Sequence, residues 1–185
     1  MSLKAGAYSL NGNSGKVSAY TFKSGLLSKI AHDLLININN FKVDVDVPEG
    51  GFASGSLNLE VQTNSLKVVC AMKEGEQQPD TLKEKDIADI EADMGKKVLH
   101  PDKYPTASFS SKSIQENGDS YHVSGDLSLH GVTKPLEFDI DTSGGGLKGR
   151  FTIIQTDYGI KPFKAMMGTL KIKDEMDIGF DLSLS

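Results

Sequence analysis

Residues 127–140 read LSLHGVTKPLEFDI, two alternating apolar and polar runs on either side of a short polar segment. Alternation at period two is typical of a β-strand with one dry face and one wet face. Gly131 gives the polar segment backbone freedom, and Pro135 stiffens the start of the second run. The stretch therefore predicts a β-hairpin. Its inward-facing positions are Leu127, Leu129, Leu136, Phe138 and Ile140.

The same alternation recurs along most of the chain, and residues 175–185 give the clearest example. Polar turn segments separate the runs at 116–119, 142–146 and 173–175. About eight to ten antiparallel strands are expected, which must pack as two sheets or close into a barrel. An eight-stranded barrel is wide enough for one small ligand. Further inward-facing positions are Tyr121, Val123, Phe151, Ile153, Ile178, Phe180 and Leu182.

Three places depart from this pattern. Residues 81–95 predict an amphipathic helix, with a Thr81–Glu84 capping box and Gly95 as its stop signal. Residues 24–31 are a weaker helical candidate. At Asn39 and Asn40 the apolar parity slips by one, which indicates either a bulge or a tight turn.

Length and charge narrow the possible functions. The 185 residues favour one domain, 1–185, with residues 1–6 outside its ordered part. The formal charge of −5 and the absence of a basic stripe argue against nucleic acid as a partner. No apolar run is long enough for a transmembrane segment, so we expect a soluble protein. A Met-Ser-Leu start can replace a removed leader, which leaves a periplasmic location open beside a cytoplasmic one.

Residues with catalytic or metal-binding potential are scattered. The histidines do not cluster at ligand spacing, and no nucleophile or phosphate-loop motif is present, so no catalytic residue, metal or cofactor is expected. His130 shares the polar parity of its strand, and its side chain should point away from the interior. Cys70 lies among Val68, Val69 and Met72, which favours a buried structural thiol.

An apolar cluster interrupts the segment 158–170, where Pro162 and Gly168 break the strand pattern. It consists of Phe163, Met166 and Met167. Flexible thioethers suit surfaces that fit variable apolar partners. The alternative is that these side chains only plug one end of the core.

Several segments in the right order resemble the YceI-like family of bacterial lipid-binding and polyisoprenoid-binding proteins. The most specific are DKYPTASFSSKSI at 102–114 and YHVSGDLSLHGVTKPLEFDI at 121–140, and the similarity runs from Val17 to Leu184. The resemblance implies an extended eight-stranded, lipocalin-like barrel with helical elements near its mouth. It also implies non-covalent binding of a long apolar molecule, such as a polyisoprenoid or isoprenoid quinone, inside the barrel.

The expected ligand-binding residues are therefore the inward-facing strand positions named above, together with Phe163, Met166 and Met167. We expect a non-catalytic carrier or sequestering protein whose partner is an isoprenoid or similar lipid, with a homodimer as a further possibility. Two alternatives stay open. One is a structural barrel with a filled core that meets a partner through its surface. The other is an enzyme built around His32 or His130.

Overall fold

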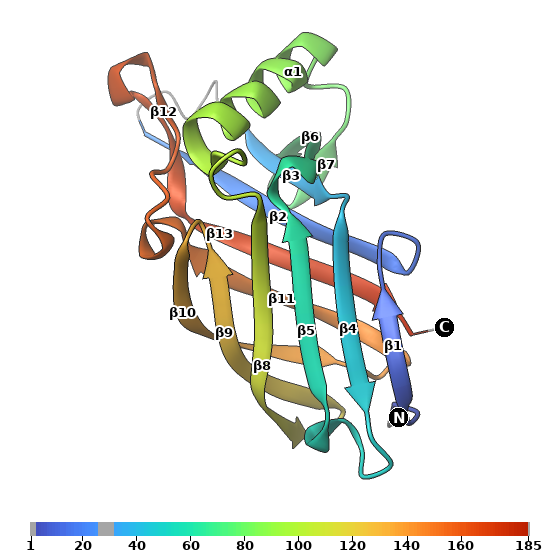
Figure 1. Ribbon diagram of the computed structural model, residues 1–185. Coiled ribbons are helices and arrows are strands. Elements are labelled where there is room, and N and C mark those ends of the chain that lie inside the picture. Colours follow the sequence, from blue (N-terminus) through green and yellow to red (C-terminus); the bar gives the residue numbers. More distant parts are fainter. Residues whose placement is uncertain (1–2, 26–31, 185) are drawn as a thin grey trace.

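The computed structural model describes residues 3–25 and 32–184, and Figure 1 shows a strongly curved sheet with a helix across one end. The strands are β1 (Gly6–Leu10), β2 (Gly15–Ser24), β3 (Asp33–Ile38), β4 (Phe41–Val47), β5 (Ser56–Gln62), β6 (Leu66–Lys73), β7 (Glu76–Gln78), β8 (Thr106–Asn117), β9 (Ser120–Leu129), β10 (Val132–Asp141), β11 (Gly146–Ile154), β12 (Lys164–Ala165) and β13 (Leu170–Ser183). The helical segments are η1 (Phe52–Ser54), η2 (Thr63–Ser65), α1 (Glu84–Asp93), η3 (Met94–Leu99), η4 (Gln155–Tyr158) and η5 (Met166–Gly168).

Within the described residues, thirteen strands form one antiparallel sheet in the order β1-β4-β5-β8-β9-β10-β11-β13-β2-β3-β6-β7, and β12 pairs with β13. The predicted all-β antiparallel class is confirmed. The strand number exceeds the eight to ten expected because β1, β7 and β12 are short additions. In addition, two long strands are bent into β3–β4 and β5–β6.

The parity slip at Asn39 and Asn40 marks one of these bends. The chain does not turn back there, because β3 pairs with β6 while β4 pairs with β5. The bonds from Asn39 N to Ser65 O (3.2 Å) and from Gln62 N to Asn40 O (3.0 Å) carry the pairing across the bend. The two bent strands, β3–β4 and β5–β6, form one hairpin. This hairpin pairs with β2 through β3 and with β8 through β5, so the sheet curls into a barrel.

The weakest backbone pairing in the barrel wall lies between β10 and β11. Their ladder contains only Asp141 with Lys148, whereas β10 pairs with β9 along its whole length. Pro135 lies in β10 opposite Asp126, and proline is confined to strand edges that need no amide donor. We call this splayed boundary the β10–β11 seam.

Of the three polar turn segments predicted from sequence, two are confirmed and one is wrong. The turns at 116–119 and 142–146 are confirmed, since they join β8 to β9 and β10 to β11. The turn at 173–175 was wrong, because β13 runs through it with only a register shift against β2. Gln155 Nε2 donates to Lys173 O (2.8 Å), and Thr156 N donates to Asp174 Oδ1 (2.8 Å). These bonds from η4 satisfy a polar bulge inside a continuous strand.

The predicted helix exists but begins and ends elsewhere. Its N-cap is Lys83, whose backbone N donates to Asp86 Oδ2 (3.0 Å), so the Thr81–Glu84 capping box was wrong. Gly95 does not stop the chain from coiling, because η3 continues to Leu99 and His100 ends it in the left-handed region. The candidate helix at 24–31 falls largely on residues 26–31, outside the described residues. Among the described residues, no helix is long and apolar enough to cross a membrane.

The core has two parts. The larger fills the barrel interior and contains all twelve inward-facing strand positions predicted from parity. The smaller lies under α1, where Ile87, Ile90 and Met94 pack against Leu34 and Val68. Cys70 is buried, as expected. The helix therefore covers one end of the barrel, which we call the mouth.

Candidate functional site: the apolar barrel interior

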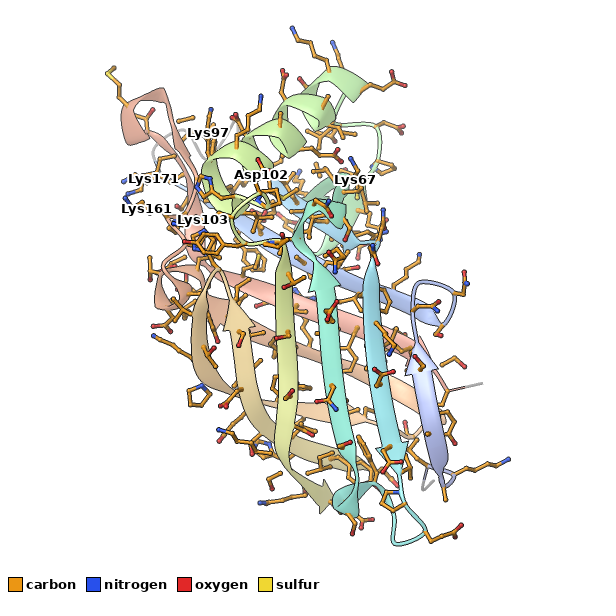
Figure 2. All side chains as sticks on the ribbon, viewed as in Figure 1. Lys67, Lys97, Asp102, Lys103, Lys161 and Lys171 are labelled. Atoms are coloured by element: carbon orange, nitrogen blue, oxygen red, sulfur yellow. The ribbon has the colours of Figure 1, made fainter. Side chains whose placement is uncertain are left out.

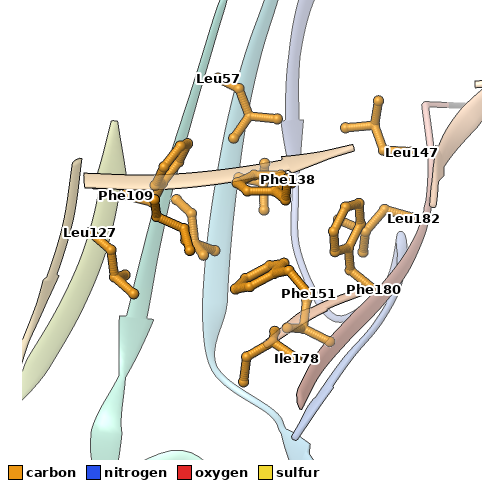
Figure 3. A pocket seen from close by; sticks show the side chains of 13 residues that line it. Leu57, Phe109, Leu127, Phe138, Leu147, Phe151, Ile178, Phe180 and Leu182 are labelled. Atoms are coloured by element: carbon orange, nitrogen blue, oxygen red, sulfur yellow. The ribbon is translucent and has the colours of Figure 1, made fainter. Parts of the chain in front are cut away.

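Four phenylalanines from four strands meet inside the barrel (Figure 3). The ring of Phe138 on β10 stacks on Phe151 of β11, with centroids 4.8 Å apart and an angle of 26° between planes. Phe109 of β8 lies 5.2 Å from Phe138, and Phe180 of β13 lies 6.0 Å away in an edge-on arrangement. Aromatic pairs prefer such offset and edge-to-face geometries. The stack between Phe138 and Phe151 also spans the β10–β11 seam, which has few backbone bonds.

Two glycines make room for these rings. A Cβ built on Gly149 would lie 2.5 Å from Phe180, and one built on Gly125 would lie 2.6 Å from Phe109. Both distances are shorter than any ordinary carbon contact, so a side chain at either position would displace an aromatic ring. The glycines of β9 and β11 therefore set the positions of Phe109 and Phe180.

The rings surround a cavity of about 60 Å³ whose lining side chains are all apolar. This is well below the roughly 300 Å³ at which ligand pockets begin, so the cavity is too small for an isoprenoid chain as it stands. The lining residues are Val17, Val43, Leu57, Leu59, Phe109, Leu127, Leu136, Phe138, Leu147, Phe151, Ile178, Phe180 and Leu182. The interior is thus dry, aromatic and nearly filled.

The residues predicted from sequence divide into three groups. The cavity lining includes Leu127, Leu136, Phe138, Phe151, Ile178, Phe180 and Leu182. Elsewhere in the same core lie Tyr121, Val123, Leu129, Ile140 and Ile153. Outside the interior lie Phe163 and Met167, and the side chain of Met166 is outside what the structure describes. Whether any of them contacts a ligand remains a prediction.

Six lining residues were not among the positions predicted from sequence. They are Val17, Val43, Leu57, Leu59, Phe109 and Leu147. Alternation identifies the face that points inward. It does not identify the level along the barrel at which several strands approach one another.

Several polar side chains lie together at the end of the barrel beside α1. His130 and Gly131 form the two-residue turn between β9 and β10, with positive φ angles of 53° and 80°. The His130 ring does not simply point outward, because it packs on Tyr104 with centroids 3.9 Å apart and lies 5.9 Å from the His100 ring. Its buried Nε2 atom has no hydrogen-bond partner among the residues that the structure describes. Burial lowers the pKa of His130, and the nearby charges of His100 and Lys103 act in the same direction.

His122 faces the outside of the wall. Its Nδ1 lies 2.8 Å from Asp139 Oδ1, and its Nε2 lies 3.6 Å from Glu137 Oε2. The hydrogen bond with Asp139 raises the pKa of His122. In the part of the chain that the structure describes, no group of three or more His, Cys, Asp or Glu side chains is arranged to hold a metal.

The curled antiparallel sheet and its apolar interior define a lipocalin-like β-barrel. Residues 8–184 match the model of the YceI-like domain, and the chain belongs to the YceI-like family. The resemblance found in the sequence is therefore confirmed.

Similar proteins are bacterial. A UPF0312 protein of Yersinia pestis (strain Pestoides F) is 44% identical over 52 residues, which are 28% of this chain and 27% of that protein. A UPF0312 protein of Pseudomonas aeruginosa (strain LESB58) is 40% identical over 73 residues, covering 34% of this chain and 38% of that one. The matched regions thus span well under half of these relatives.

Solved structures share the fold at low sequence identity. BcnA of Burkholderia cenocepacia superimposes with a TM-score of 0.67 at 18% identity, over 92% of this chain and 96% of that one. A polyisoprenoid-binding domain from Saccharophagus degradans, described as implicated in plant cell wall breakdown, gives 0.59 at 14% identity over 94% of both chains. The YceI protein of Campylobacter jejuni gives 0.53 at 14% identity, over 81% of this chain and 85% of that one.

Proposed function

We propose that this protein binds a long apolar molecule, such as a polyisoprenoid chain or isoprenoid quinone, non-covalently in the barrel interior, and that it carries or sequesters that molecule without catalysis. The observation that carries the proposal is the wholly apolar lining of the interior cavity. The polyisoprenoid-binding domain of Saccharophagus degradans, which has a similar fold, supports this ligand class.

The energetics of such binding are favourable if the interior can open. Burying about 400 Å² of apolar surface at about 25 cal/mol per Å² gives about 10 kcal/mol, before the entropy of association and the loss of internal packing are subtracted. The cavity of about 60 Å³ must therefore expand, with the phenylalanine rings moving apart. The β10–β11 seam has the fewest backbone bonds to break during that expansion.

The small cavity also favours a second candidate, a barrel with a permanently filled core that acts through its surface. In that case the aromatic cluster is ordinary packing, and no ligand enters.

Extraction distinguishes the two candidates. The protein is purified without detergent, extracted with organic solvent and analysed by mass spectrometry, and the delipidated protein is then titrated with an isoprenoid quinone and, separately, a fatty acid. A carrier yields a co-purified lipid or a melting temperature that rises with ligand concentration. If no lipid is extracted and no ligand raises the melting temperature, the protein is a filled barrel that acts through its surface.

A further inference from the structure

The segment between Asp157 and Asp174 differs in charge from the rest of the molecule. It contains four lysines and no acidic residue, in a chain whose formal net charge is −5. The lysines are Lys161, Lys164, Lys171 and Lys173, and all four are exposed. Among the described residues none of the four has an ion-pair partner, whereas Lys112, Lys134 and other lysines of the wall pair with aspartates.

Two of these lysines repel each other in the folded structure. Lys164 of β12 lies directly opposite Lys171 of β13 in an antiparallel pair. Like charges at such positions destabilise a hairpin. An anionic surface next to the hairpin would relieve this repulsion, so the arrangement favours a negatively charged partner.

The tip of the same hairpin presents an apolar side chain to water. Met167 is fully exposed (105%), and the only other exposed large apolar side chain among the described residues is Val69 at 39%. The backbone of Met167 is in the left-handed region, with φ 55° and ψ 30°. A methionine at a projecting tip with lysines around it matches the pattern of peripheral segments that lie on membranes, where apolar side chains enter the interface and lysines attract anionic lipids.

The hairpin lies at the mouth of the barrel. Figure 2 shows Lys161 and Lys171 on the same side of the mouth as Lys97 and Lys103. The Lys97 ammonium lies 5.6 Å from the centre of the Phe163 ring, which ties η3 to this segment. The acidic residues of α1 lie on the neighbouring element, so a negatively charged surface would approach by the hairpin rather than by the helix.

From this combination we propose that the β12–β13 hairpin docks the mouth of the barrel onto an anionic phospholipid surface, with Met167 entering the interface and Lys161, Lys164 and Lys171 contacting the headgroups. This goes beyond binding of a ligand in the interior and does not depend on it. The docked orientation would bring the mouth against the bilayer.

The test uses the whole protein and sedimentation with vesicles of phosphatidylcholine alone or with about one-third phosphatidylglycerol. We expect binding to the anionic vesicles that falls steeply as salt is raised, because exposed charges are screened. Lys164→Gln with Lys171→Gln should weaken it about tenfold or more, since each lysine near an anionic membrane contributes about 1 kcal/mol. The matched control is Lys16→Gln with Lys148→Gln, two lysines that flank Asp181 near the far end of β13, which removes the same charge and should leave binding nearly unchanged.

Insertion of the hairpin tip into the membrane can be measured by the fluorescence of one introduced tryptophan, because the chain itself contains none. Met167→Trp should show a blue-shifted emission with anionic vesicles and quenching by brominated lipid, whereas Val69→Trp should show neither. The proposal is overturned if the protein ignores anionic vesicles, binds neutral ones equally well, or loses binding equally in both lysine pairs. Lipid extraction measures interior binding separately, so either proposal can fail while the other holds.

Discussion

Single glycines determine how closely the aromatic rings pack. Gly149→Ala would bring a Cβ to 2.5 Å from the Phe180 ring and 2.6 Å from the backbone oxygen of Asp139. Because the backbone oxygen cannot move away freely, we expect a loss of about 1–3 kcal/mol in the free energy of unfolding by urea. Gly144→Ala is the matched control, since nothing lies within 4 Å of the position that its methyl group would take and its φ is ordinary. Equal stabilities of the two variants would contradict this account of the packing.

Two histidines should titrate on opposite sides of the ordinary value of 6.5. The Asp139 carboxylate raises the pKa of His122, so its stabilising contribution is complete below 6.5 and is lost as pH rises through the folded-state pKa. Burial lowers the pKa of His130, so stability falls as pH drops below 6.5 toward its folded-state pKa. NMR titration of the ring protons measures both values, and His122→Gln assigns the higher one. A pKa of His130 above that of His122 would disprove the assignment.

At the scale of elements, one carboxylate fastens α1 to the barrel. Glu91 accepts hydrogen bonds from Val68 N (3.0 Å) and from Lys67 Nζ (2.7 Å), next to a register shift in the β3–β6 pairing. Glu91→Ala leaves the Val68 amide without this acceptor, and we expect a cost of about 1.5–3 kcal/mol together with faster hydrogen exchange in α1. Asp89→Ala removes an exposed acid from the same helix and should change neither quantity. Unchanged exchange in the Glu91 variant would show that the apolar contacts alone hold the helix.

The β10–β11 seam predicts a pattern of amide exchange along one strand. Since Leu129 and Val132 close a two-residue turn, the amides of Lys134, Leu136 and Phe138 point toward β9, and those of Thr133 and Glu137 point toward the seam. Hydrogen exchange measured by NMR should be slow at the first three and fast at the other two. Slow exchange at Glu137 would mean that β10 and β11 are paired in solution beyond Asp141.

The elements that sequence predicted well are those whose signals are local. The turn at His130 and Gly131 follows from its own residues and from the alternation on either side. The polar segment 173–175 was misread because its hydrogen-bond partners, Gln155 and Thr156, are distant in the sequence. The bend at Asn39 likewise depends on Ser65. For the interior, parity identified the inward face of each strand, but the lining depends on which strands meet at one level.

For the molecule as a whole, the packing that stabilises the barrel and the ligand binding that we propose require the same interior space. The rings that fill the interior stabilise the empty barrel, and the same rings must separate before an isoprenoid chain can enter. The charged side chains lie at the mouth and on the outer wall, and the cavity lining is wholly apolar, so no charge is desolvated in the interior. The balance between a filled barrel and a carrier is therefore a matter of free energy that a single substitution can shift.

Phe138→Ala removes the ring that contacts Phe109, Phe151 and Phe180. We expect it to lower the stability of the ligand-free protein by about 3 kcal/mol and to enlarge the cavity. If the barrel is a carrier, saturating isoprenoid should restore part of that loss, because a ligand bound only to the folded state stabilises it by mass action. Phe52→Ala is the matched control. Phe52 belongs to η1, at the end of the barrel opposite α1, packs on Tyr121 (5.1 Å) and lies outside the cavity lining, so isoprenoid should stabilise this variant only as much as it stabilises the unchanged protein. Thermal unfolding of both variants, with and without isoprenoid, measures the stability that each gains from the ligand. If Phe138→Ala gains no more than Phe52→Ala, the aromatic cluster is permanent packing.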